Sequence, residues 1–128
     1  MPLEIQIQKD INPNSTGPVT VKLTGSLDTA TAPELERQLT PVLAGPIKDL
    51  VFELALLRFI SSAGLRVFAV ARKQLKERGG QVSFVNMQPQ IKEVFEIMKS
   101  LPGMAVFESL EELDRYLAVR QRSYDESR

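Results

Sequence analysis

Histidine, cysteine and tryptophan are all absent from this chain of 128 residues. Without histidine, the usual general base, the Ser-His-Asp triad and most zinc sites are excluded, which argues against a self-contained hydrolase. Without cysteine there are no disulfides to suggest secretion. Because tryptophan is missing and aromatic residues make up only 6% of the chain, a stacking platform for single-stranded nucleic acid is not expected.

An excess charge of one sign and long apolar runs are lacking as well. Sixteen Lys and Arg balance sixteen Asp and Glu, so the basic excess that usually accompanies a nucleic-acid partner is missing. No stretch approaches the ~20 apolar residues of a membrane span, and residues 1–4 lack the basic and apolar regions of a signal peptide. We therefore expect a cytoplasmic protein with no nucleic-acid partner and no membrane span.

Periodic patterns predict an α/β fold. Apolar and polar residues alternate in segments 3–8 and 19–25, with a loop of turn-forming residues between them, which predicts an antiparallel hairpin. Helical and strand patterns then alternate, which argues for a sheet that is parallel beyond the hairpin. The further predicted elements are helices at 31–44, 62–78, 89–99 and 109–117 and strands at 50–57, 81–86 and 104–107.

The predicted fold is thus a mixed sheet of about five strands with about four helices. Residues 1–118 are expected to form a single domain, and residues 119–128 a polar, frayed tail. Thr31 and Glu34 have the spacing of a capping box at the start of the first helix.

Two serines, Ser61 and Ser62, stand where the buried strand gives way to a helix. The first N–H groups of a helix lack partners and carry partial positive charge, so such a site suits an anion. A serine here can be a cap, an anion ligand or a hydroxyl that becomes phosphorylated; a cap contributes about 1 kcal/mol over alanine. Gly64, in the first helical turn, costs up to about 1 kcal/mol relative to alanine. That cost favours a surface that another backbone approaches closely.

Two charged residues are candidate neighbours of the serines. Asp28 also follows a strand and precedes a helix, so both loops could emerge at one edge of the sheet. There it could orient a serine hydroxyl, or it could simply cap its own turn. Arg66 lies four residues beyond Ser62 on the same helical face and could hold a phosphate or an acidic partner, or be solvated. The acidic residues of the last helix, Glu111, Glu112 and Asp114, are interpreted as a solvated face.

Three segments together resemble the STAS domain, the family of the bacterial anti-sigma factor antagonists: residues 25–28, residues 50–65 and residues 79–86. The resemblance implies a switch protein rather than an enzyme, with no cofactor or metal of its own. Its implied partners are a GHKL-type serine kinase that is also an anti-sigma factor, and a metal-dependent serine phosphatase. The kinase uses ATP to phosphorylate a serine at the helix start, and the complex then dissociates.

The family pattern of Asp, Ser, Ser or Thr, and Gly corresponds here to Ser61, Ser62, Ala63 and Gly64. The resemblance therefore implies Ser62 as the phosphorylation site, with Ser61 as the second choice. The expected partner-binding residues are Asp28, Ser61, Ser62, Ala63, Gly64 and Arg66. Two alternatives stay open: a constitutive STAS subunit of a transport or signalling complex without a phosphate cycle, and a module that binds a small ligand or nucleotide.

Overall fold

The structure, a computed structural model, describes residues 2–9, 18–100 and 110–126. Its elements, in chain order, are β1 (Leu3–Gln8), β2 (Val19–Leu27), α1 (Ala32–Ala44), β3 (Asp49–Ile60), α2 (Ser62–Glu77), β4 (Gln81–Val85), α3 (Pro89–Ser100) and α4 (Leu110–Glu126). None of the helices in the described ranges is long and apolar enough to cross a lipid bilayer.

The sheet has the predicted mixed topology. Its strands lie in the order β1-β2-β3-β4, with β1 antiparallel to β2 and with β2, β3 and β4 parallel. The hairpin and the parallel arrangement beyond it are therefore confirmed. The fifth strand expected at residues 104–107 lies outside the described residues.

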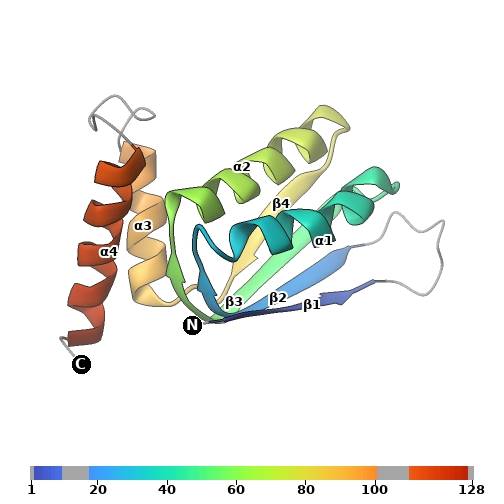
Figure 1. Cartoon of the computed structure of the whole chain (residues 1–128). Coiled ribbons are helices and arrows are strands. Elements are labelled where there is room, and N and C mark those ends of the chain that lie inside the picture. Colours follow the sequence, from blue (N-terminus) through green and yellow to red (C-terminus); the bar gives the residue numbers. More distant parts are fainter. Residues whose placement is uncertain (1, 10–17, 101–109, 127–128) are drawn as a thin grey trace.

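Helices α1 and α2 cover one face of the sheet (Figure 1), and the core lies beneath them. In the first six residues of β2 and of β3 every second residue is buried, as the strand period requires, and the alternation ends where the pairing of the two strands shifts register. Four phenylalanine rings with centroid separations of 4.6 to 6.2 Å join β3, α2, β4 and α3. The cluster consists of Phe52, Phe68, Phe84 and Phe95.

The second half of β3 extends beyond its neighbour β4, which pairs only with Asp49 to Glu53. Unpaired backbone groups on such an edge need other partners. Side-chain amides supply them: Gln88 donates to the Ala55 carbonyl at 2.8 Å and Gln90 to the Arg58 carbonyl at 3.1 Å. Helices α3 and α4 stand side by side at this end of the molecule (Figure 1).

Two local expectations are wrong. The capping box does not form, because the Thr31 hydroxyl donates to the Ser26 carbonyl at 2.8 Å while the Glu34 carboxylate binds Arg37 and Gln38. The frayed tail from residue 119 is also contradicted, because α4 continues to Glu126. That helix is held by a buried side chain in the supposed tail, as described below.

Candidate functional site

The carboxyl ends of β2 and β3 lie next to each other. Leu27 pairs with Ile60, and the Ser61 N–H donates to the Leu27 carbonyl at 2.9 Å. Asp28 and Ser61 therefore begin adjacent loops, as the sequence predicted. In open α/β sheets this edge is where sites are built. We call residues 60–64 the β3–α2 corner.

Ser61 does not cap the helix that it precedes. Its backbone is extended, with φ −102° and ψ 176°, and its side chain makes no capping bond. The residue is only 4% exposed, and its hydroxyl oxygen is buried without a hydrogen-bond partner in the described part of the chain. A buried, unpaired hydroxyl is destabilising, so capping does not explain this serine.

Ser62 is the first residue of α2, and a carboxylate from a distant helix binds it twice. The Ser62 N–H donates to Asp114 Oδ1 at 2.8 Å, and the Ser62 hydroxyl donates to Asp114 Oδ2 at 2.9 Å. Asp114 thereby places a negative charge at the positive end of the α2 dipole and satisfies one of its free N–H groups. Hydrogen bonds to an ionised group are about twice as strong as neutral ones.

Helix α4 covers the β3–α2 corner. The buried side chain of Gln121 accepts from the Ile60 N–H at 2.8 Å and donates to the Ile60 carbonyl at 2.7 Å. Leu113 and Leu117, on the same side of α4, are fully buried. Ser62 is consequently only 9% exposed. Ser62 does not face solvent in this conformation, because the last helix lies over it and Asp114 binds its hydroxyl.

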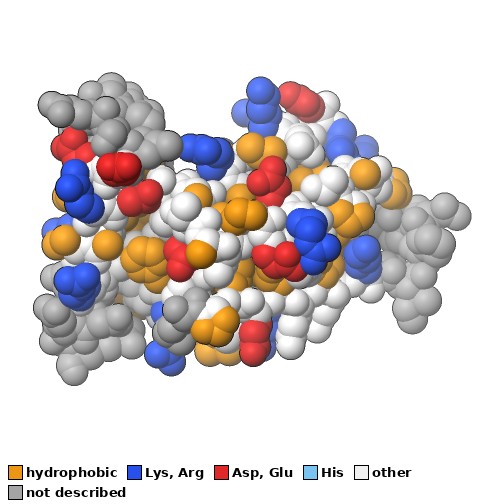
Figure 2. All heavy atoms as spheres, in the orientation of Figure 1, with side chains coloured by type: hydrophobic (Ala, Val, Ile, Leu, Met, Phe, Trp, Pro, Cys, Tyr) orange, Lys and Arg blue, Asp and Glu red, His pale blue; other side chains and the backbone are white. Residues whose placement is uncertain are grey.

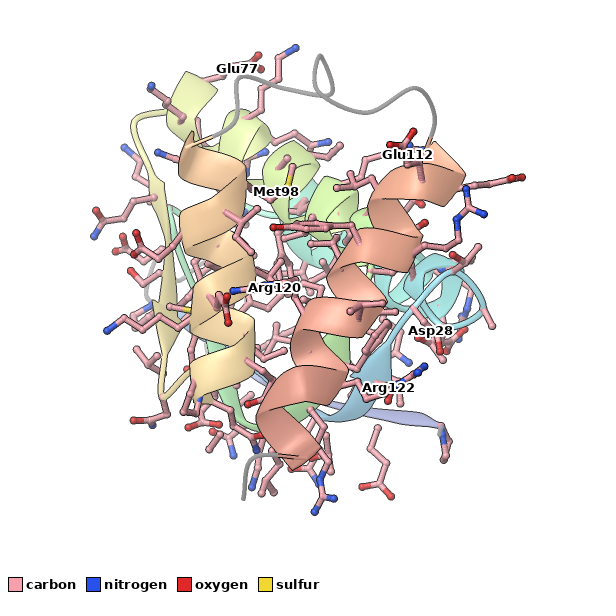
Figure 3. All side chains as sticks on the ribbon, turned by 90° about the vertical axis from the view of Figure 1, so that its left-hand side faces the viewer. Asp28, Glu77, Met98, Glu112, Arg120 and Arg122 are labelled. Atoms are coloured by element: carbon pink, nitrogen blue, oxygen red, sulfur yellow. The ribbon has the colours of Figure 1, made fainter. Side chains whose placement is uncertain are left out.

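A polar contact also joins α4 to α3. Arg120 reaches across from α4 to form an ion pair with Glu93 of α3 (Figure 3). The second carboxylate oxygen of Glu93 and the amide oxygen of Gln90 are buried without hydrogen-bond partners in the described ranges. Helix α4 is thus seated on its neighbours through charged and amide groups as well as leucines.

Asp28 takes the role of a turn-capping residue. One oxygen of its carboxylate accepts hydrogen bonds from the N–H groups of Ala30 and Thr31, both at 3.0 Å. Asp28 lies at the end of β2, where the chain turns toward α1 (Figure 3). Asp28 therefore begins the loop next to the serines, but its carboxylate is engaged in its own turn.

Close packing inside the protein explains the glycine at position 64. A Cβ at this position would lie 2.6 Å from Leu27 Cγ and 3.0 Å from Ile60 Cγ1. Real carbon atoms do not approach so closely, and Leu27 and Ile60 are fully buried. The glycine lets α2 begin directly against the strand ends, so its low helix propensity does not require an approaching partner.

Ala63 and Arg66 lie beside a groove between α1 and α2. The groove has a volume of about 540 Å³ and an apolar floor that includes Leu39, Leu43 and Val67. Arg66 is exposed, whereas Ala63 is half-buried. On the side seen in Figure 2, charges of both signs are interspersed among apolar side chains. On α1, an ion pair joins Arg37 to Glu34, and the hydrogen bond from Arg37 lowers the pKa of the Glu34 carboxyl to about 2.

Asp114 and Gln121 are the site residues that the sequence interpretation missed. The acidic pattern of the last helix predicts a solvated face for Asp114, as for the exposed Glu111, and Gln121 falls within the predicted tail at residues 119–128. One signal was available: Leu113, Leu117 and Gln121 recur every four residues, which places them on one helical face. A glutamine that continues an apolar stripe is a candidate for a buried hydrogen-bonding role.

The chain belongs to the STAS domain family, whose model matches residues 4–113. It is similar to two curated relatives. One is BtrV of Bordetella bronchiseptica, a candidate anti-sigma factor antagonist, with 36% identity over 70% of this chain and 77% of that protein. The other is the anti-sigma-B factor antagonist of Staphylococcus aureus, with 32% identity over 60% of this chain and 71% of that protein.

Solved structures share the fold. The anti-sigma factor antagonist SpoIIAA in its unphosphorylated form has a TM-score of 0.60 at 18% identity, covering 73% of this chain and 83% of that one. SpoIIAA of Bacillus in its phosphorylated form has a TM-score of 0.58 at 18% identity, covering 73% and 82%. An anti-sigma factor antagonist from Mycobacterium paratuberculosis has a TM-score of 0.58 at 24% identity, covering 78% and 83%.

Proposed function

We propose that this protein is a partner-switching regulator of the anti-sigma factor antagonist type, controlled by phosphorylation of Ser62, and that it is not an enzyme. The unmodified protein binds a GHKL-type serine kinase that is also an anti-sigma factor. Phosphorylation ends the complex, and a metal-dependent serine phosphatase restores it. The observation that carries the proposal is the Ser62 hydroxyl at the first position of α2, in a chain similar to anti-sigma factor antagonists.

The site has the chemistry that a phosphate switch needs. In the transfer, a bond forms between Ser62 Oγ and the γ-phosphorus of ATP, the bond from that phosphorus to the departing ADP breaks, and the hydroxyl proton is released. The product adds about −1.5 to −2 charges at a position that carried none. At a docking face such a charge weakens binding through repulsion and desolvation. Lowering the bound fraction of the partner from about 99% to about 1% takes about 5.5 kcal/mol of differential binding.

The proposed partner-binding surface surrounds Ser62. It consists of Asp28, Ser61, Ser62, Ala63, Gly64 and Arg66. Arg66 is already exposed beside the groove between α1 and α2. Ser62 becomes accessible to a kinase only when α4 yields, because the helix covers the hydroxyl and Asp114 holds it.

The direct test is phosphorylation of the full chain by a GHKL-type kinase from its own genome, with ATP and magnesium. We expect one phosphate, located on Ser62 by mass spectrometry and absent from Ser62→Ala. Ser61→Ala is the matched control: it removes a hydroxyl that has no hydrogen-bond partner among the described residues, so it should fold and still carry one phosphate on Ser62. A phosphate on any other residue contradicts the assignment.

A second function, a constitutive STAS interaction subunit without a phosphate cycle, is favoured by two observations. Both serine hydroxyls are buried in this conformation, and the residue between Ser62 and Gly64 is an alanine. The two functions differ in the binding assay. If Ser62→Asp binds the kinase with the affinity of the wild type, and the wild type takes up no phosphate, the constitutive function is the correct one.

A further inference from the structure

We propose that α4 is a cover for Ser62 whose docking is set by the charge on that residue. While Ser62 carries a hydroxyl, Asp114 holds the helix on the β3–α2 corner. A negative charge at Ser62 expels the helix. This inference rests on the proposed function, because it concerns the regulation of the same serine.

The anchoring contacts of α4 converge on the corner. Asp114 accepts two hydrogen bonds from Ser62, and Gln121 makes two with the backbone of Ile60. Asp114 and Gln121 are seven residues apart, which is about two helical turns, so they lie on one face of α4. The face of α4 that binds the β3–α2 corner is thus also the face that contacts Ser62 and responds to its charge.

The Ser62–Asp114 contact changes sign when Ser62 is modified. Asp114 Oδ2 lies 2.9 Å from the Ser62 oxygen because a hydroxyl hydrogen stands between the two atoms. A phosphate, or a carboxylate at this position, replaces that hydrogen-bond donor with negative oxygens. Like charges within about 4 to 6 Å disfavour each other, so the attraction becomes a repulsion. The Ser62 N–H is then free to bind the new anion in place of Asp114.

Some buried polar atoms in the parts that α4 packs against lack hydrogen-bond partners, as expected where a helix undocks. Across the described ranges, three buried side-chain atoms lack hydrogen-bond partners: Ser61 Oγ, Gln90 Oε1 and Glu93 Oε2. All three belong to the corner or to α3, which are the parts that α4 packs against. Burial without a partner is unfavourable, and water relieves it once the helix moves away. These unpaired atoms lower the free-energy cost of undocking α4, which favours a response to a charge at Ser62.

Hydrogen exchange on the full chain tests the proposal without any kinase. In Ser62→Asp we expect the amides of α4 from residue 113 to 122 to exchange about tenfold faster or more. A factor of this size corresponds to the loss of one charge-assisted hydrogen bond that holds the helix. Ser62→Ala adds no charge and should keep most of the protection. The double variant Ser62→Asp with Asp114→Asn should regain it, because the repulsion is gone.

Matched controls separate this cover from general destabilisation. Glu111→Gln, which neutralises an exposed carboxylate on the same helix, should not restore protection to Ser62→Asp. The amides of β2, and those of β3 apart from Ile60, should exchange as slowly as in the wild type; the Ile60 amide is excepted because it donates to Gln121 of α4. Asp114→Ala alone should also speed the exchange of the α4 amides, which provides a second test if Ser62→Asp does not fold.

Two results overturn the proposal: wild-type protection of α4 in either Ser62→Asp or Asp114→Ala, or a double variant as unprotected as Ser62→Asp. Failure of the proposed function looks different. If α4 responds to charge as described but no GHKL-type kinase phosphorylates the chain, the cover stands and the phosphate switch falls. If Ser62 is phosphorylated and α4 stays protected, the switch stands and the cover falls.

Discussion

Replacing Gln121 with alanine tests whether α4 is bound to the end of the sheet. The side chain satisfies both the N–H and the carbonyl of Ile60, at 2.8 and 2.7 Å, and it is only 2% exposed. Gln121→Ala leaves two buried backbone groups without partners, and each such loss costs about 1–3 kcal/mol. We expect the free energy of unfolding to fall by about 2–4 kcal/mol, since part of the loss is recovered by water entering the gap.

Urea denaturation followed by circular dichroism measures this loss, and hydrogen exchange at the Ile60 amide locates it. Arg122→Ala is the matched control, because Arg122 is the exposed neighbour of Gln121 on the same helix. The control should change stability by less than about 0.5 kcal/mol, as for ordinary surface substitutions. A loss in Gln121→Ala no larger than that of the control refutes the reasoning.

Three further predictions concern packing and charge. Gly64→Ala should destabilise the protein by about 1–3 kcal/mol, because overpacking against Leu27 outweighs the better helix propensity of alanine; an unchanged or higher thermal midpoint contradicts this. Arg78 donates to three backbone carbonyls around the end of α1, so Arg78→Ala should lower the urea midpoint. Arg78→Lys should recover only part of the loss, because lysine lacks the planar guanidinium. Full recovery by lysine would show that the guanidinium geometry is not needed to bind these carbonyls. NMR titration should give the Glu34 carboxyl a pKa of about 2, returned toward 4.5 in Arg37→Ala. Because that pKa is lowered on folding, the pair stabilises the fold above about pH 4.5 and loses its effect as pH falls toward 2. A wild-type midpoint near 4.5 rules the pairing out.

The spacing of apolar residues and the order of strands and helices along the chain were enough to predict the topology around the site. The alternating segments predicted the hairpin, and the strand–helix alternation predicted the parallel strands. From these it followed that Asp28 and Ser61 would begin neighbouring loops, and the pairing of Leu27 with Ile60 confirms this. Such inferences succeed because they depend on which face a whole segment buries, and many residues contribute to that signal.

The contacts that decide the state of Ser62 were not predictable in the same way. Asp114 and Gln121 bind partners 52 and 61 residues away, and each contact depends on one polar side chain rather than on a repeated pattern. An aspartate on a polar helix face looks the same in sequence whether it is solvated or capping another helix. Gly64 shows a related difficulty. Its unfavourable helix propensity is explained by a close contact with Leu27, which local sequence patterns do not reveal.

The most direct measurement of the central claim is a time course of phosphorylation of the wild type and Gln121→Ala by the same GHKL-type kinase, with the phosphate located by mass spectrometry. We expect a single phosphate on Ser62 in both proteins, incorporated faster in Gln121→Ala because α4 leaves the serine more often. A phosphate elsewhere, or none in either protein, contradicts the assignment of this corner as the switch.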